Sequence, residues 1–117
     1  MSRADATADG DEITLLAETF RLLGDPTRLR ILIACLGGPM AVGAIAEAVG
    51  ASQTLVSHHL RLLRAARLVR GEKQARHVLY ALTDAHVSQM LRDMIDHARE
   101  DDHEPAAPMP QPEGMTR

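Results

Sequence analysis

The chain has 117 residues, which is enough for one small domain and too few for two. Hydrophobic residues make up 45% of the chain but aromatic residues only 2%, so the core has to be aliphatic. The single cysteine, Cys35, excludes an intrachain disulfide and any metal site that needs two thiolates from one chain. The net charge of −3 hides a basic segment between Thr54 and Tyr80, where a single acid, Glu72, accompanies six basic residues: Arg61, Arg64, Arg67, Arg70, Lys73 and Arg76.

No apolar stretch reaches the roughly eighteen residues that a membrane helix needs, and the N-terminus has no hydrophobic signal core, so we expect a cytoplasmic protein. Residues 1–10 are small, polar and acidic, which predicts disorder. Helical periodicity begins at Asp11 and stops at Gly24-Asp25-Pro26, where the aspartate can cap a second helix. Cys35 lies in the apolar run of that second helix, which predicts a buried core position.

The next segment has the pattern of two short helices joined by a tight turn. A helix is expected from Val42 to Val49, and Gly50 can end it in the left-handed conformation. Ser52 can cap the following helix, from Gln53 to about Ala66. The second helix is rich in polar and basic side chains, which is typical of a helix-turn-helix.

A strand pair follows this helix-turn-helix. Leu68 to Arg70 is expected to form one strand, Gly71 to Ala75 a turn, and Arg76 to Leu82 the second strand. The order of elements predicts a winged helix, that is, a mainly α-helical fold with a β-hairpin. We expect this domain to span residues 11–103 and a disordered, Pro-rich tail to occupy residues 104–117.

The N-terminal residues of a recognition helix contact base edges in the major groove. In this chain, the residues expected to make these contacts are Gln53, Thr54, Ser57 and His58. Arg61 and Arg64 lie further along, where they meet phosphates or stabilise the fold. On the wing, Lys73 and Arg76 can reach the DNA backbone or the minor groove. His59 points about 100° away from its neighbour His58, so the two cannot share one ion, and we expect a structural or surface role for His59.

The last periodic segment, Thr83 to His103, predicts one amphipathic helix with an apolar stripe: Val87, Met90, Leu91, Met94, Ile95 and Ala98. Asp84 and His86 begin it, and His97 and Glu100 lie near its end. The two histidines fall on one line of the helix but roughly 16 Å apart, too far to share one ion. Two copies packed antiparallel would bring these pairs together, which predicts a homodimer with two identical metal sites.

Taken together, these segments resemble the ArsR/SmtB family of metal-sensing winged-helix repressors. The resemblance rests on DPTRLRIL (25–32), VGAIAEAVGASQTLVSHHLRLLRAARLV (42–69), RHVLYAL (76–82) and D-x-H…H-x-x-E (84, 86, 97, 100). It implies a homodimer, formed through the N- and C-terminal helices, that binds operator DNA when metal-free and releases it when metal binds. The last motif resembles the dimer-interface site of the zinc-sensing branch, which includes cobalt- and nickel-responsive members.

The donor set of two imidazoles and two carboxylates suits tetrahedral Zn(II) and also Co(II), whereas Ni(II) usually prefers more ligands. His103 or the acidic N-terminus could add ligands. In the arsenic- and cadmium-sensing branches of the family that this chain resembles, a cysteine pair lies where this chain has Val42-Gly43-Ala44-Ile45. The resemblance therefore disfavours a sensor that binds its metal through thiolates. Two alternatives remain: a winged-helix repressor that answers a non-metal signal, and a metal-buffering protein without specific DNA binding. The sequence shows no combination of a nucleophile, a base and an orienting group, so we do not expect an enzyme.

Overall fold

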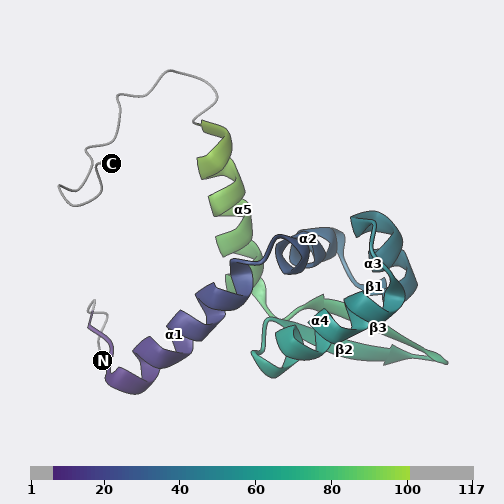
Figure 1. Ribbon diagram of the computed structural model, residues 1–117, viewed down its shortest axis with the longest axis horizontal. Coiled ribbons are helices and arrows are strands. Elements are labelled where there is room, and N and C mark those ends of the chain that lie inside the picture. The colour runs from purple at the N-terminus through teal and green to yellow at the C-terminus, as the bar shows by residue number, and fades with distance from the viewer. Residues whose placement is uncertain (1–6, 101–117) are drawn as a thin grey trace.

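The structure, a computed structural model, describes residues 7–100. Five α-helices, a short 3-10 helix and three strands follow one another within these residues (Figure 1). Their order along the chain is α1 (Gly10–Leu23), α2 (Pro26–Ala34), η1 (Cys35–Gly37), β1 (Met40–Ala41), α3 (Val42–Val49), α4 (Gln53–Ala65), β2 (Val69–Gln74), β3 (His77–Leu82) and α5 (Ala85–Glu100).

Local signals set most helix ends where the sequence predicts them. Asp25 accepts a hydrogen bond from the Arg28 N–H at 2.9 Å and caps α2, and Ser52 caps α4 through the Leu55 N–H at 3.1 Å. Gly50, at φ +73°, ends α3 in the left-handed conformation. Helix α1 begins one residue earlier than expected, because Asp9 forms a reciprocal capping box with Glu12.

The hairpin differs from its prediction. Strand β2 continues through Gly71 to Gln74, so the expected turn at residues 71–75 shrinks to Ala75 and Arg76. Ala75 lies at φ +55°, a conformation that glycine or asparagine usually adopts. Because neither residue occurs at this position, the sequence did not indicate that the turn lies at Ala75 and Arg76. Strand β1 was not predicted; it pairs Met40 with Tyr80 and completes an antiparallel sheet of order β1-β3-β2.

Aliphatic side chains from α2, α3 and α4 form the core together with buried residues at the base of the hairpin. The largest fully buried side chains are Ile31, Leu32, Ile45, Val56, Leu60, Leu63 and Val69. Cys35 is buried among them, as expected. The element order and sheet confirm a winged helix-turn-helix, with α3 and α4 as the two helices and β2–β3 as the wing.

Helices α1 and α5 project from this core on the side away from the hairpin tip (Figure 1). Only Leu22 of α1 and Leu91 of α5 are buried. Helix α5 begins at Ala85 rather than Thr83, because Asp84 caps it by accepting the Val87 N–H at 3.1 Å. The predictions for residues 1–6, His103 and the Pro-rich tail fall outside the described residues. Between residues 7 and 100, no helix is long and apolar enough to cross a membrane.

The end of α4 generates a stability prediction. Arg67 lies at φ +63°, and the bonds Arg67 N–H to Arg64 O (3.0 Å) and Leu68 N–H to Leu63 O (2.9 Å) form the turn that usually carries glycine. Arg67→Gly should therefore raise the unfolding free energy by about 0.5–1 kcal/mol, because glycine relieves the left-handed strain. Chemical denaturation at fixed protein concentration measures this change.

Gly50 provides the matched control, because it occupies the corresponding position at the end of α3. Gly50→Ala should lower stability by a similar amount, and a stabilised Gly50→Ala variant would contradict the assignment of strain to these two residues.

Candidate nucleic-acid interface and metal-binding helix

The orientation of α4 is set by the residues that it buries. Val56, Leu60 and Leu63 are 0–2% exposed and face the core. On the opposite side, the structure brings together all four predicted groove residues. With one arginine they line a single surface hollow of about 520 Å³: Gln53, Thr54, Ser57, His58 and Arg61. The amide of Gln53 also lies next to Gly43 of α3, where a Cβ would be 3.2 Å from Nε2.

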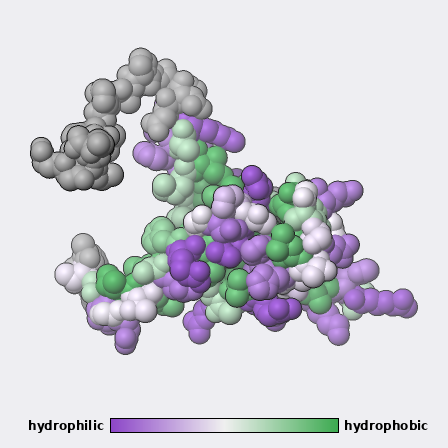
Figure 2. All heavy atoms as spheres, in the orientation of Figure 1, coloured by the Kyte–Doolittle hydropathy of each residue, from purple (hydrophilic) through white to green (hydrophobic). Residues whose placement is uncertain are grey.

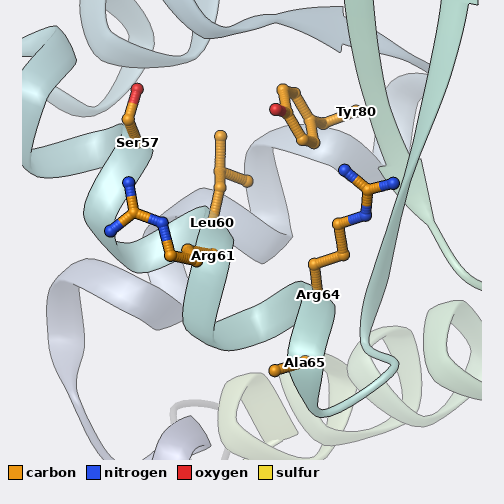
Figure 3. A pocket seen from close by; sticks show the side chains of 6 residues that line it. All are labelled: Ser57, Leu60, Arg61, Arg64, Ala65 and Tyr80. Carbon is orange, nitrogen blue, oxygen red and sulfur yellow. The ribbon is translucent and has the colours of Figure 1, made fainter.

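A second hollow of about 390 Å³ lies between α4 and the wing and shares Ser57 and Arg61 with the first. Figure 3 shows Arg61 and Arg64 reaching out of α4 on either side of Leu60, with Tyr80 of β3 beside Arg64. No acidic residue lines this hollow. It is therefore a cationic recess beside the residues expected to enter a DNA groove.

The wing carries the remaining predicted DNA contacts. Lys73 and Arg76 are exposed near the hairpin tip, and Lys73 pairs with Val78 of β3. Within residues 7–100, neither these two side chains nor Arg61 and Arg64 form an ion pair with a carboxylate. Four cations thus remain available to phosphates along the edge of α4 and the wing.

Arg70 has a structural role that the sequence did not reveal. Its Nη1 donates to the carbonyl oxygens of Leu82 at 3.0 Å and Thr83 at 2.8 Å, and its Nε donates to Glu72 at 2.9 Å. Arg70 therefore fastens the base of β2 to the segment that leads into α5. Only the three-dimensional pairing of β2 with β3 brings these groups together, so no sequence signal could have found the contact.

His59 is half-buried, unlike its exposed neighbour His58, which agrees with the structural role expected for it. Its Nδ1 is buried and has no hydrogen-bond partner within residues 7–100. Removal from water lowers the pKa of His59; Asp25 opposes this shift, while Arg28 and His58 reinforce it. Burial therefore disfavours the protonated form of His59.

The four predicted metal ligands lie in two pairs at opposite ends of α5. At the beginning, His86 Nδ1 is 3.7 Å from Asp84 Oδ1. The Val87 N–H donates to this carboxylate and lowers the pKa of Asp84; partial burial opposes that shift, and His86 adds a smaller lowering. His97 and Glu100 are exposed at the other end. Residues 7–100 contain no group of three or more potential ligands, so this part of one subunit offers the predicted ligands only as pairs.

Asp84 nevertheless fits both of the roles that it would need. A carboxylate has two oxygens, and the helix cap uses Oδ1 of Asp84, so Oδ2 can bind a cation. His86 is 97% exposed, and its imidazole can turn toward an incoming group. The donor chemistry at this end of α5 therefore suits a borderline divalent metal.

Comparison with known proteins agrees with the geometry. The family model described as "Bacterial regulatory protein, arsR family" matches residues 25–70. The HTH-type transcriptional regulator NmtR of Mycobacterium tuberculosis is 40% identical over 97 residues, covering 83% of this chain and 81% of that protein. A transcriptional repressor SmtB homolog of Synechocystis is 40% identical over 92 residues, covering 79% and 70%.

Among solved structures, the cadmium metal-sensor CMTR from M. tuberculosis superimposes with a TM-score of 0.63 at 36% identity, covering 82% of this chain and 94% of that one. Fold and surface define a winged helix-turn-helix DNA-binding protein. The chain belongs to the arsR family of bacterial regulatory proteins. It is a transcriptional regulator and not an enzyme, as the sequence predicted.

The burial of His59 predicts a pH effect on stability. Because its pKa is lower in the folded chain than the usual 6.5, the unfolded chain binds more protons near and below that pH. The unfolding free energy should therefore fall as the pH decreases from about 7 to 5, and His59→Gln should flatten this dependence. Urea denaturation with chelator present measures both slopes. His58→Gln is the exposed control and should keep the wild-type slope; an unchanged slope in His59→Gln would refute the assignment.

Proposed function

We propose that this chain is a metal-responsive repressor of the cytoplasm, which binds operator DNA when metal-free and releases it when Zn(II) binds at the interface of a homodimer. Co(II) and Ni(II) are the alternative metals. The observation that carries the proposal is that the two predicted ligand pairs lie at opposite ends of α5, whose apolar side is only partly buried and leaves Met94 exposed.

Exposed apolar side chains on α1 and α5 support the homodimer. On α1, Leu15 and Phe20 are 66% and 64% exposed, and Ile13 and Leu16 are at least half exposed. On α5, Met94 is 55% exposed. Figure 2 shows hydrophobic side chains on both projecting helices. Such apolar surface on the two projecting helices is typical of a protein–protein interface.

An antiparallel pairing of α5 with its copy would place Asp84 and His86 of one subunit beside His97 and Glu100 of the other. Two-fold symmetry then makes two equal sites, each with two imidazoles and two carboxylates. This donor set suits Zn(II) or Co(II); His103, which is outside the described residues, would be an additional ligand if Ni(II) is the effector.

The chain differs from a thiolate-based cadmium sensor in the chemistry that it offers. Cys35 is its only cysteine, and burial raises the pKa of this thiol to about 11. A protonated, enclosed thiol is a poor metal ligand. The likeness to the cadmium metal-sensor CMTR supports metal sensing in general, while the side chains of this chain favour nitrogen and oxygen coordination.

Regulation would follow from linkage between the two sites. The ligand pairs fix how one α5 lies against the other, and α5 is joined to the wing through the Arg70 contacts with Leu82 and Thr83. In the metal-free arrangement, the dimer presents its two α4 helices to successive major grooves, about 34 Å apart. In the metal-bound arrangement, the two helices no longer fit both grooves. Metal and operator then weaken each other's binding equally, by about 1–3 kcal/mol in a useful switch.

The direct test is fluorescence anisotropy of the protein on DNA from its own promoter, with Zn(II), Co(II), Ni(II) or chelator. One of the metals should lower the DNA affinity at least tenfold, about 1.4 kcal/mol of coupling. Equal affinity with every metal and with chelator would favour a repressor for another signal. Metal binding without preference for promoter DNA would favour a metal-buffering protein.

Asp84→Asn separates the helix-capping role of this residue from its role as a ligand. Asparagine caps helices about as well as aspartate, so α5 and metal-free DNA binding should be preserved. The anionic ligand is lost, so metal affinity should fall at least tenfold and with it the effect of metal on DNA binding. Anisotropy with and without metal measures this effect.

Asp93→Asn is the matched control, because Asp93 is an exposed aspartate of the same helix outside the ligand pairs. It should respond to metal as the wild type does. Full metal response in Asp84→Asn would exclude Asp84 as a ligand.

A further inference from the structure

We propose that the hollow between α4 and the wing is a binding site for one phosphodiester of the DNA backbone, and that Gly71 positions Arg64 in it. The proposal rests on the proposed function as an operator-binding protein. It adds a defined phosphate site, with Tyr80 as a contact and Gly71 as a positioning residue, to the basic surface already described.

The chemistry of the hollow is that of an oxyanion site. Arg61 and Arg64 bring two guanidinium groups, which bind phosphate oxygens in a bidentate manner. Hydroxyl groups of Ser57 and Tyr80 line the same space and are the kind of donors that proteins direct to the DNA backbone. No carboxylate lines the hollow to neutralise these cations.

The floor of the hollow favours a sugar-phosphate backbone over a bare ion. Leu60 lies between the two arginines and is almost completely buried, while the exposed Ala65 lies beyond Arg64, and a deoxyribose ring can pack on the small apolar surface that they leave (Figure 3). The hollow is also continuous with the groove-facing surface, because Ser57 and Arg61 line both. The backbone of a DNA strand whose bases contact the beginning of α4 would therefore run across this hollow.

Gly71 makes room for Arg64. In the sheet register, Gly71 lies directly opposite Tyr80. A Cβ at this position would be 3.4 Å from Arg64 Nη1 and 3.3 Å from Val78 Cγ1, so a Cβ alone would need shifts of a few tenths of an ångström, and the further atoms of a larger side chain would crowd the guanidinium. No left-handed backbone angle requires glycine here, since Gly50 and Gly38 are the glycines of residues 7–100 with positive φ. The two neighbours that a side chain here would crowd are thus Val78 and Arg64.

The salt dependence of DNA binding tests the phosphate site. Each lost phosphate contact lowers the slope of log affinity against log salt by about 0.9, so Arg64→Ala should lower it by about 1.8 in a dimer. Promoter and unrelated DNA should weaken by the same factor, because a phosphate carries no sequence. Tyr80→Phe, which removes only a hydroxyl, should weaken both DNAs while leaving the slope unchanged.

Arg30→Ala is the matched control, since Arg30 is an exposed arginine of α2 outside the hollow, and it should keep the wild-type slope. A wild-type slope in Arg64→Ala would overturn the phosphate site. Failure of the wild-type protein to prefer its promoter would instead refute the proposed function, so the two failures are distinguishable.

A double-mutant cycle tests the role of Gly71. Gly71→Val should weaken DNA binding as Arg64→Ala does, and it should add nothing in the Arg64→Ala background, because the displaced guanidinium is already absent. Valine suits a strand, so the hairpin should fold, and thermal melting checks this. Additive losses in the double variant would show that Gly71 does not act through Arg64.

Tyr80 is the only tyrosine in the chain, which has no tryptophan, so its fluorescence reports directly on the hollow. Titration with inorganic pyrophosphate distinguishes the two sources of phosphate. We expect no saturable change at micromolar concentrations. A saturable change in this range that disappears in Arg64→Ala would assign the hollow to a free anion and overturn the DNA-backbone assignment.

Discussion

The packing of α4 against the core is the interaction on which the rest of the structure depends. Val56, Leu60 and Leu63 are almost completely buried, and they leave α4 no freedom to rotate about its axis. The same three contacts therefore determine which residues face outward toward DNA. The wing is placed by the same core, since Leu68 and Val69 are buried beside them. Recognition helix and wing are thus two surfaces of one rigid unit.

The accuracy of the sequence-based predictions follows the range of the interactions involved. Helix ends with local caps, such as Ser52 and Gly50, were predicted closely because their partners lie within a few residues. Strand β1 was missed because two residues become a strand only through pairing with distant Tyr80 and Leu79. The ligand pairs on α5 were predicted from spacing, but the site that they would form needs a second subunit and stays a prediction.

Two arginines with similar sequence surroundings have different roles. Arg64 ends in an open recess without a carboxylate, whereas Arg70 is held by two backbone carbonyls and Glu72. A count of basic residues cannot separate a cation that is available to DNA from one that serves the fold. Burial and hydrogen bonding make the distinction, and they explain why a chain of net charge −3 can present a cationic edge.

In the proposed dimeric repressor, the apolar side of α1 would make regulation depend on the concentration of the protein. In a dimer built on Leu15 and Phe20, dilution separates the subunits, and each then carries one recognition helix and incomplete metal sites. As the protein concentration falls, operator occupancy and metal sensitivity would therefore decline together, and both would decline more steeply than the concentration itself.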